Sequence, residues 1–172
     1  MINQVVSNFI RFLALVLVQV LILNNVQLNG YLNPFMYVLF IMLLPFETPG
    51  WVLLVASFGI GITVDMFSNT LGMHAAASVF LGYVRPRIIK FISPRDGYES
   101  EAVPSLKHMG LRWFLSYTII MVLLHHFVLF FIEAFSFGEF FGTMLRVILS
   151  SSLTVVLILI SQYLFIRNTT DK

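Results

Sequence analysis

Three ionisable side chains in one apolar stretch could in principle bind a metal ion. His125 and His126 are adjacent, and Glu133 follows seven residues after His126, on the same face of a helix. Adjacent residues on an α-helix point about 100° apart, so both imidazoles cannot face one ion without distortion. The H-E-x-x-H pattern of zinc peptidases is also absent. We therefore expect interhelical hydrogen bonding or an interface role for these histidines, and no metal ion or other cofactor.

A nucleophilic enzyme has equally little support in the sequence. Three consecutive serines at 150–152 form a polar patch, but neither a G-x-S-x-G turn nor a phosphate-binding loop occurs. Serines in membrane helices commonly pack closely or bond to the preceding turn of their own helix. We expect no enzymatic activity and name no catalytic residue. The alternative left open is an intramembrane enzyme that uses His125, His126 and Glu133.

An aspartate within an apolar run raises a different possibility. Asp65 lies about 22 Å along a predicted helix that begins near Gly50 and crosses a hydrocarbon core about 30 Å thick. A charge near the edge of the bilayer costs less than one at its centre. Ser68, Asn69 and Thr70 offer hydrogen-bond donors, and the positive end of the next helix favours an anion. We hypothesise that Asp65 is the structural clasp of the corner between the two helices. Direct contact with a partner, or ligand or proton chemistry, are the alternatives.

Small residues accompany this aspartate at helical spacing. Ser57 and Gly61 precede it, and Ser78 and Gly82 repeat the small-x-x-x-small pattern in the next helix. Such positions let helices approach closely, either inside one protein or between partners, so this surface could pack internally or bind a partner. Gly72 supplies the freedom that a tight turn requires. The candidate structural or partner-binding residues are Gly61, Asp65, Asn69, Gly72, His74, Ala76 and Gly82.

The elements that hold these residues follow from composition. Hydrophobic residues make up 59% of the 172-residue chain, charged residues only 10%, and the mean hydropathy is +0.93. A soluble domain carries about 25% charged residues, so we predict an all-α integral membrane protein with a single domain over residues 1–172. The chain contains no cysteine, which excludes disulfides, thiol catalysis and cysteine-ligated metals. A net charge of +2 gives no indication of nucleic-acid binding.

Six apolar segments are predicted to form transmembrane helices. An Asn-rich loop, the Pro-containing segment PFETPG and a hydrophilic loop at 93–110 separate them. The second segment is expected to be short, tilted or partly re-entrant. Ser136 and Glu139 fit a capping box at the start of the sixth helix. The six predicted helices cover about 5–23, 34–44, 50–66, 73–92, 111–131 and 137–166.

Basic residues predict the orientation in the membrane. The predicted outer loops contain no Lys or Arg, so the positive-inside rule places both termini and the 93–110 loop in the cytoplasm. Arg146 is the exception on the outer side, and we expect it to reach the headgroups or to pair with Glu133 or Glu139. The basic residues grouped around the connection between the fourth and fifth helices are Arg85, Arg87, Lys90, Arg95, Lys107 and Arg112.

Several stretches together carry a resemblance to a known family. The first is G-x-x-x-D followed by a turn, L-G and an Ala-rich helix, here Gly61, Asp65, Leu71, Gly72 and residues 75–77. The others are LLPFETPGW, SPRDGY and HHFVLFFIEAFSF. In these stretches, and in its length and six-helix plan, the chain resembles the MreD family of bacterial rod shape-determining proteins, in the version found in Bacteroidetes.

The resemblance implies a fold similar to the S-components of energy-coupling-factor transporters and a non-enzymatic role in cell elongation. Such proteins bind MreC in the bacterial inner membrane and work with MreB filaments, RodA and a class B penicillin-binding protein in side-wall peptidoglycan synthesis. On this basis we expect the small-residue surface to contact MreC. The alternative is a vitamin-binding S-component, which needs an outward-facing polar pocket. For that, the outer loops offer chiefly Asn24, Asn25, Gln27 and Asn29.

Overall fold

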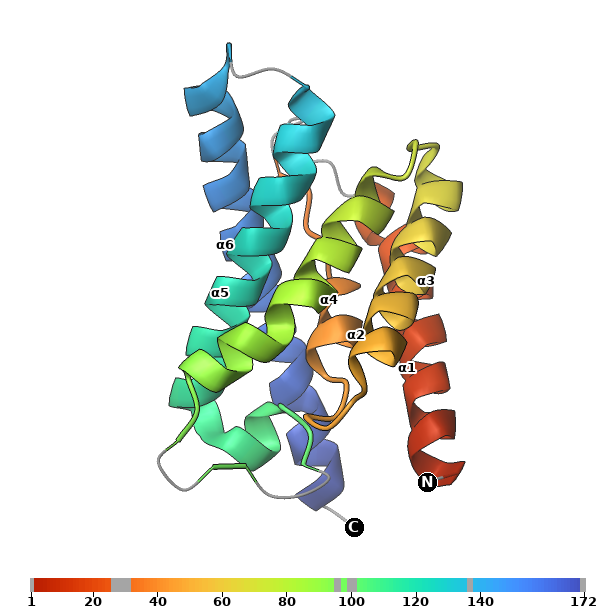
Figure 1. Ribbon diagram of the computed structural model, residues 1–172, viewed down its shortest axis with the longest axis vertical. Coiled ribbons are helices and arrows are strands. Elements are labelled where there is room, and N and C mark those ends of the chain that lie inside the picture. Colours follow the sequence, from red (N-terminus) through yellow and green to blue (C-terminus); the bar gives the residue numbers. More distant parts are fainter. Residues whose placement is uncertain (1, 26–31, 95–96, 99–101, 136–137, 171–172) are drawn as a thin grey trace.

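The protein is a bundle of long helices around a short buried one (Figure 1). The computed structural model describes residues 2–25, 32–94, 97–98, 102–135 and 138–170, and no β-strand occurs among them. The ends of the chain lie at one end of the bundle, which we call the terminal end, and the turn at 69–72 lies at the opposite, corner end (Figure 1). The helices are α1 (Ile2–Leu21), the 3-10 turn η1 (Leu23–Asn25), α2 (Val38–Met42), α3 (Gly50–Ser68), α4 (Met73–Phe91), α5 (Leu106–Ala134) and α6 (Phe140–Thr170).

Four of these helices are long and apolar enough to cross a membrane. They cover residues 4–25, 50–68, 106–134 and 140–166, with mean hydropathies of 1.7 to 2.2. Large apolar side chains such as Trp51, Phe58 and Phe141 are more than half exposed on the outside, where a soluble protein rarely gathers them. The α4 helix is not among the four, because its second half carries Arg85, Arg87 and Lys90. The chain is therefore an all-helical membrane protein, as composition predicts.

The predicted second helix is wrong for most of its length. Of residues 34–44 only Val38–Met42 are helical, and the backbone before them has no regular secondary structure apart from a turn at 36–37. We call residues 32–44 the inner segment, which runs from the corner end toward the terminal end (Figure 1). Every residue from 34 to 44 is buried, and α2 packs against α1, α3, α4 and α5. Periodicity could not reveal this, because a fully buried segment shows no polar face.

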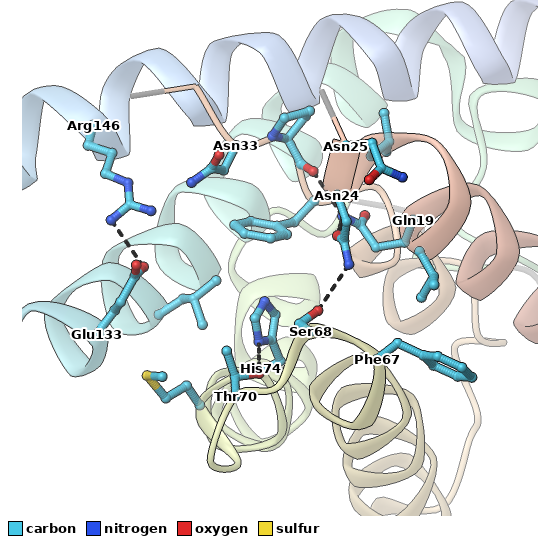
Figure 2. A pocket seen from close by; sticks show the side chains of 16 residues that line it. Gln19, Asn24, Asn25, Asn33, Phe67, Ser68, Thr70, His74, Glu133 and Arg146 are labelled. Carbon is cyan, nitrogen blue, oxygen red and sulfur yellow. Dashed lines mark hydrogen bonds and ion pairs between the residues drawn. The ribbon is translucent and has the colours of Figure 1, made fainter. Parts of the chain in front are cut away.

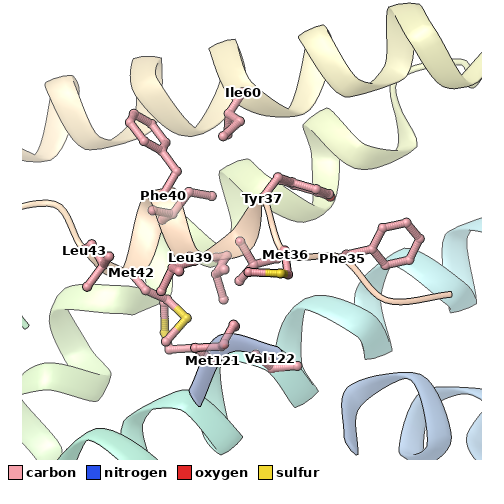
Figure 3. Packing of buried hydrophobic residues seen from close by; sticks show 14 of the residues in the cluster. Phe35, Met36, Tyr37, Leu39, Phe40, Met42, Leu43, Ile60, Met121 and Val122 are labelled. Carbon is pink, nitrogen blue, oxygen red and sulfur yellow. The ribbon is translucent and has the colours of Figure 1, made fainter. Parts of the chain in front are cut away.

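The inner segment forms the centre of the hydrophobic core. Tyr37, Val38, Ile41 and Met42 are each 0% exposed. Figure 3 shows their neighbourhood, with Ile60 of α3 on one side and Met121 and Val122 of α5 on the other. Lipid tails are as apolar as these side chains, so close packing rather than exclusion of water stabilises this centre.

Two further boundaries differ from expectation. The α5 helix begins at Leu106 rather than 111, so the end of the predicted 93–110 loop is helical. Gly110 interrupts it with φ 75° and ψ 165°, which separates a first turn from the long helix that follows. The α6 helix begins at Phe140 rather than 137. Of the proposed capping box, Ser136 lies outside the described residues, and Glu139 directly precedes the helix instead of lying within its first turn. The Glu139 backbone carbonyl accepts a bond from the Thr143 N–H at 3.0 Å.

Candidate functional site

Asp65 holds the corner between α3 and α4. Its carboxylate is 2% exposed, and Oδ2 accepts a hydrogen bond from the Ala75 N–H at 2.8 Å. Oδ1 accepts from the His74 N–H at 3.1 Å and from the Thr70 hydroxyl at 2.5 Å, and it also lies 3.1 Å from His74 Nδ1. These are the contacts that a clasp requires. They cap the first turn of α4 with a carboxylate from another helix, where the helix dipole favours negative charge.

Backbone conformation at the corner explains two more candidate residues. Asn69 has φ 54° and Gly72 has φ 80°, both in the left-handed region that lets the chain reverse within a few residues. The Asn69 N–H bonds to the Asp65 carbonyl and ends α3. Asn69 therefore serves the backbone of Asp65 rather than its carboxylate. The Ser68 hydroxyl makes no bond to the Asp65 carboxylate either, and it accepts one from Asn24 Nδ2 at 3.0 Å.

Two of the small residues assigned to the MreC-binding surface pack inside the protein instead. A Cβ on Gly61 would lie 2.5 Å from Ala75 Cα, and one on Gly82 would lie 2.5 Å from Ser57 Oγ. Both glycines therefore allow α3 and α4 to touch, which was the alternative left open. Ala76 differs, because it is exposed on the outer face of α4.

The Gly61 contact can be tested against a neighbouring glycine. Gly61→Ala should lower the free energy of unfolding by about 1–3 kcal/mol, because the added methyl meets backbone atoms that cannot move aside. Gly59→Ala is the matched control, since no atom lies within 4 Å of a Cβ at that position. SDS titration of the purified variants in detergent measures both. Equal stability of the two variants would show that the helices are less closely packed than described.

A polar pocket opens beside the clasp at the corner end (Figure 2). It has a volume of about 390 Å³. Gln19 Oε1 and His74 Nε2 are buried without a hydrogen-bond partner among the described residues. Glu133 and Arg146 form an ion pair at 3.1 Å, so Arg146 does pair with one of its two expected partners. The polar and charged side chains in the lining are Gln19, Asn24, Asn25, Asn33, Ser68, Thr70, His74, Glu133 and Arg146.

The pocket bears directly on the vitamin-binding alternative. Asn24 and Asn25 line it as that alternative requires, whereas Gln27 and Asn29 lie outside the described residues. His74, Glu133 and Arg146 were not expected there, because they come from three helices that only the fold brings together. The site thus combines hydrogen-bond donors and acceptors with one ion pair.

The two adjacent histidines bind the part of the inner segment that precedes α2. His125 Nε2 is hydrogen-bonded to the Tyr37 hydroxyl at 2.7 Å, and His126 Nε2 to the Thr154 hydroxyl at 3.1 Å. Thr154 in turn accepts a bond from the Phe35 N–H at 3.1 Å. The expected interhelical hydrogen bonds are therefore present. Within the described ranges no three His, Asp or Glu side chains are grouped as metal ligands.

Other polar side chains form hydrogen bonds to the backbone at the start of the inner segment. Ser150 Oγ accepts a bond from the Asn33 N–H at 3.1 Å, and Gln19 Nε2 donates to the Pro34 carbonyl at 3.1 Å. Ser152 bonds to Ile148 in its own helix, as expected for a membrane serine. Backbone outside a helix needs such partners within the membrane, because no water is available there to bond to its N–H and C=O groups.

Arg85 satisfies the backbone hydrogen-bonding groups at the other end of the inner segment. The sequence did not reveal this role. We counted it among the cytoplasmic loop charges, but it is 1% exposed. Its guanidinium donates to the carbonyls of Met42 and Leu44 and, through Nε, to the Tyr117 hydroxyl at 3.1 Å. Tyr117 donates to the Met42 carbonyl at 3.2 Å. The correction has a physical cause: the C-terminal carbonyls of α2 need donors, and a basic side chain from α4 reaches them.

Comparison with family models, curated proteins and solved structures found no match for this chain.

Proposed function

We propose that the protein is a non-enzymatic membrane scaffold of the MreD type, which binds MreC and supports side-wall peptidoglycan synthesis. MreB filaments, RodA and a class B penicillin-binding protein are its indirect partners in this proposal. The strongest support comes from the motif that carries the resemblance, because its residues together form one structural feature. Gly61, Asp65, Gly72 and Ala75 all contribute to one fixed corner between α3 and α4. A rigid corner suits a scaffold, because it fixes the angle at which two helices are presented to a partner.

The proposed orientation places the terminal end in the cytoplasm and the corner end outside the inner membrane. Lys90, Lys107 and Arg112 belong to the part of α4 and α5 near the terminal end, in agreement with the positive-inside rule. The inner segment is counted as one passage, so six passages leave both termini cytoplasmic. In this view α4 is a spanning helix despite its charges, because Arg85 is buried inside the protein.

The proposed MreC-binding face is the outer side of the corner. Ala76 is exposed there, and Met66 and Leu71 near the turn are 75% and 98% exposed. Gly61 and Gly82 are not part of this face, because they pack between α3 and α4. A small residue flanked by apolar side chains permits the close approach of a partner's membrane helix.

An added side chain at Ala76 should block that approach. Ala76→Leu should reduce copurification of MreC about tenfold, the effect of an overpacked contact, while the protein still inserts and melts normally. Ser152→Leu is the control, since it also enlarges a small exposed residue, on α6. Full MreC binding by the Ala76 variant would place the interface elsewhere, and no MreC binding by the wild-type protein would remove the proposed function itself.

A substrate-binding S-component of a vitamin transporter is the second candidate, and the polar pocket is the observation that favours it. Its volume of about 390 Å³ falls within the range of about 300–1,000 Å³ that small-molecule sites occupy. Mass spectrometry of the purified protein separates the two functions, because an S-component should carry a stoichiometric small molecule that a scaffold does not need.

A further inference from the structure

A second pocket lies between α1 and α6, near the terminal end. It has a volume of about 570 Å³ and is separate from the polar pocket at the corner end. Residues of α1 such as Ala14 and Leu15 form one wall, and residues of α6 such as Phe165 form the other. Leu39 and Leu43 of the inner segment lie at its base, and residues 103–108 close it toward the terminal end.

The ionisable groups that line this second pocket among the described residues are all basic: Arg11, Lys107 and His108. Arg11 makes its two hydrogen bonds through Nη1, to Asn8 Oδ1 at 2.9 Å and to the Leu43 carbonyl at 3.3 Å. Its remaining N–H groups form no hydrogen bond with the part of the chain that the structure describes. Lys107 is exposed and can move toward it. Two cations from different elements thus face one opening, and none of the described lining residues is acidic.

The apolar part of the pocket extends away from these cations along the helix axes. Val18 lies two turns after Arg11 on α1, about 10 Å further toward the corner end. Beyond Arg11 the α1 wall is formed by Ala14, Leu15 and Val18. The α6 wall has Phe165 near the terminal end and Ser161 and Gln162 further in. Along α1, polarity therefore changes in the direction found in a single leaflet, with charge at the surface and hydrocarbon toward the middle.

We propose that this pocket binds an anionic phospholipid of the leaflet at the terminal end. Its phosphate lies between Arg11 and Lys107, and one acyl chain lies along the apolar walls. Basic pockets between membrane helices on the cytoplasmic side are suited to anionic headgroups. A free anion would use only the cations and leave the apolar wall uncovered. A peptide helix would have to bury Arg11 and Lys107 against its own apolar side chains. The lipid satisfies both parts of the pocket at once.

Native mass spectrometry of the purified protein with defined lipids tests the proposal. Phosphatidylglycerol should bind to the wild-type protein at least about tenfold more tightly than zwitterionic phosphatidylethanolamine, and should raise its Tm. Arg11→Gln with Lys107→Gln should abolish this preference. Glutamine ends two bonds short of the Nη1 that reaches the Leu43 carbonyl, so the Tm without added lipid is measured to show that the pocket pair is folded. Arg87→Gln with Lys90→Gln is the matched control, since it removes two exposed charges from α4, outside the pocket.

Two further measurements separate the lipid from other occupants. Ala14→Trp should fill the apolar part and weaken phosphatidylglycerol binding while both cations remain. Inorganic phosphate should neither raise the Tm nor displace the lipid. The proposal is overturned if the control pair loses the preference as fully as the pocket pair does. It is also overturned if phosphate alone reproduces the stabilisation, or if Ala14→Trp binds the lipid normally. None of these readouts depends on MreC.

Discussion

Replacing Arg85 with methionine should lower the free energy of unfolding by about 3–5 kcal/mol, among the largest effects expected from one substitution in this protein. Methionine is apolar and of similar length, so it fills the space but leaves the Leu44 carbonyl and the Tyr117 hydroxyl oxygen without their donor. The Met42 carbonyl keeps the bond from Tyr117 and loses the one from Arg85. In a dry interior each unsatisfied group costs about 1–3 kcal/mol. SDS titration in detergent micelles measures the loss.

The neighbouring Arg87 provides the control for this experiment. It is exposed and bonds only to Tyr83 of its own helix, with its guanidinium 4.3 Å from that ring. Arg87→Met should therefore change stability by less than about 1 kcal/mol. Because the chain has no cysteine, Met42→Cys gives a local probe. Its labelling by a maleimide should be slow in the wild-type background and faster with Arg85→Met. If Arg85→Met is as stable as Arg87→Met, the end of α2 does not depend on this guanidinium.

Asp65→Leu should have an effect of about 3 kcal/mol or more. Leucine removes the acceptor of the His74 and Ala75 N–H groups and of the Thr70 hydroxyl, so the first turn of α4 loses its cap. Asp65→Asn keeps the length of the side chain but only one of its two acceptor oxygens, and both carboxylate oxygens accept bonds. An asparagine must direct an NH₂ group at a donor, so we expect an intermediate loss of about 1–2 kcal/mol.

Glu133→Leu is the control for the loss of a carboxylate. Its ion pair with Arg146 is partly exposed, with 41% of the glutamate side chain accessible, so it contributes about 1 kcal/mol or less. Thermal melting in detergent ranks the wild-type protein and the three variants. If Asp65→Leu melts like the wild-type protein but no longer retains MreC, Asp65 acts at the interface and the clasp is wrong.

Local patterns were enough to predict part of this structure. The α1, α3, α4, α5 and α6 helices follow long apolar runs with clear breaks, and their bounds agree within a few residues except at the start of α5. The contacts of Asp65 could also be anticipated, because its donors lie within ten residues along the chain. Contacts between residues that are close in the sequence can be predicted without knowing the rest of the fold.

The remaining features depend on residues far apart in the sequence. Residues 34–44 read as a helix because they are apolar, yet the backbone near Asn33 and Phe35 bonds to Ser150 and Thr154 of α6. Arg85 looks like a loop charge until the carbonyls it serves are known. The spacing of Gly61 and Gly82 indicates a close helix contact, but it cannot say whether the contact is internal. The polar pocket likewise needs side chains from both halves of the chain.

The dependence of the inner segment on later helices has a consequence for biogenesis. During synthesis the ribosome delivers residues 32–44 before any of α4, α5 or α6 exists. The Phe35 N–H has its partner 119 residues further along, at Thr154. Until that partner emerges, lipid cannot satisfy the N–H and C=O groups of this non-helical backbone. The segment must therefore stay in water, in the translocation channel or in another conformation until then. Assembly of the centre is thus a late step, which follows the synthesis of α6.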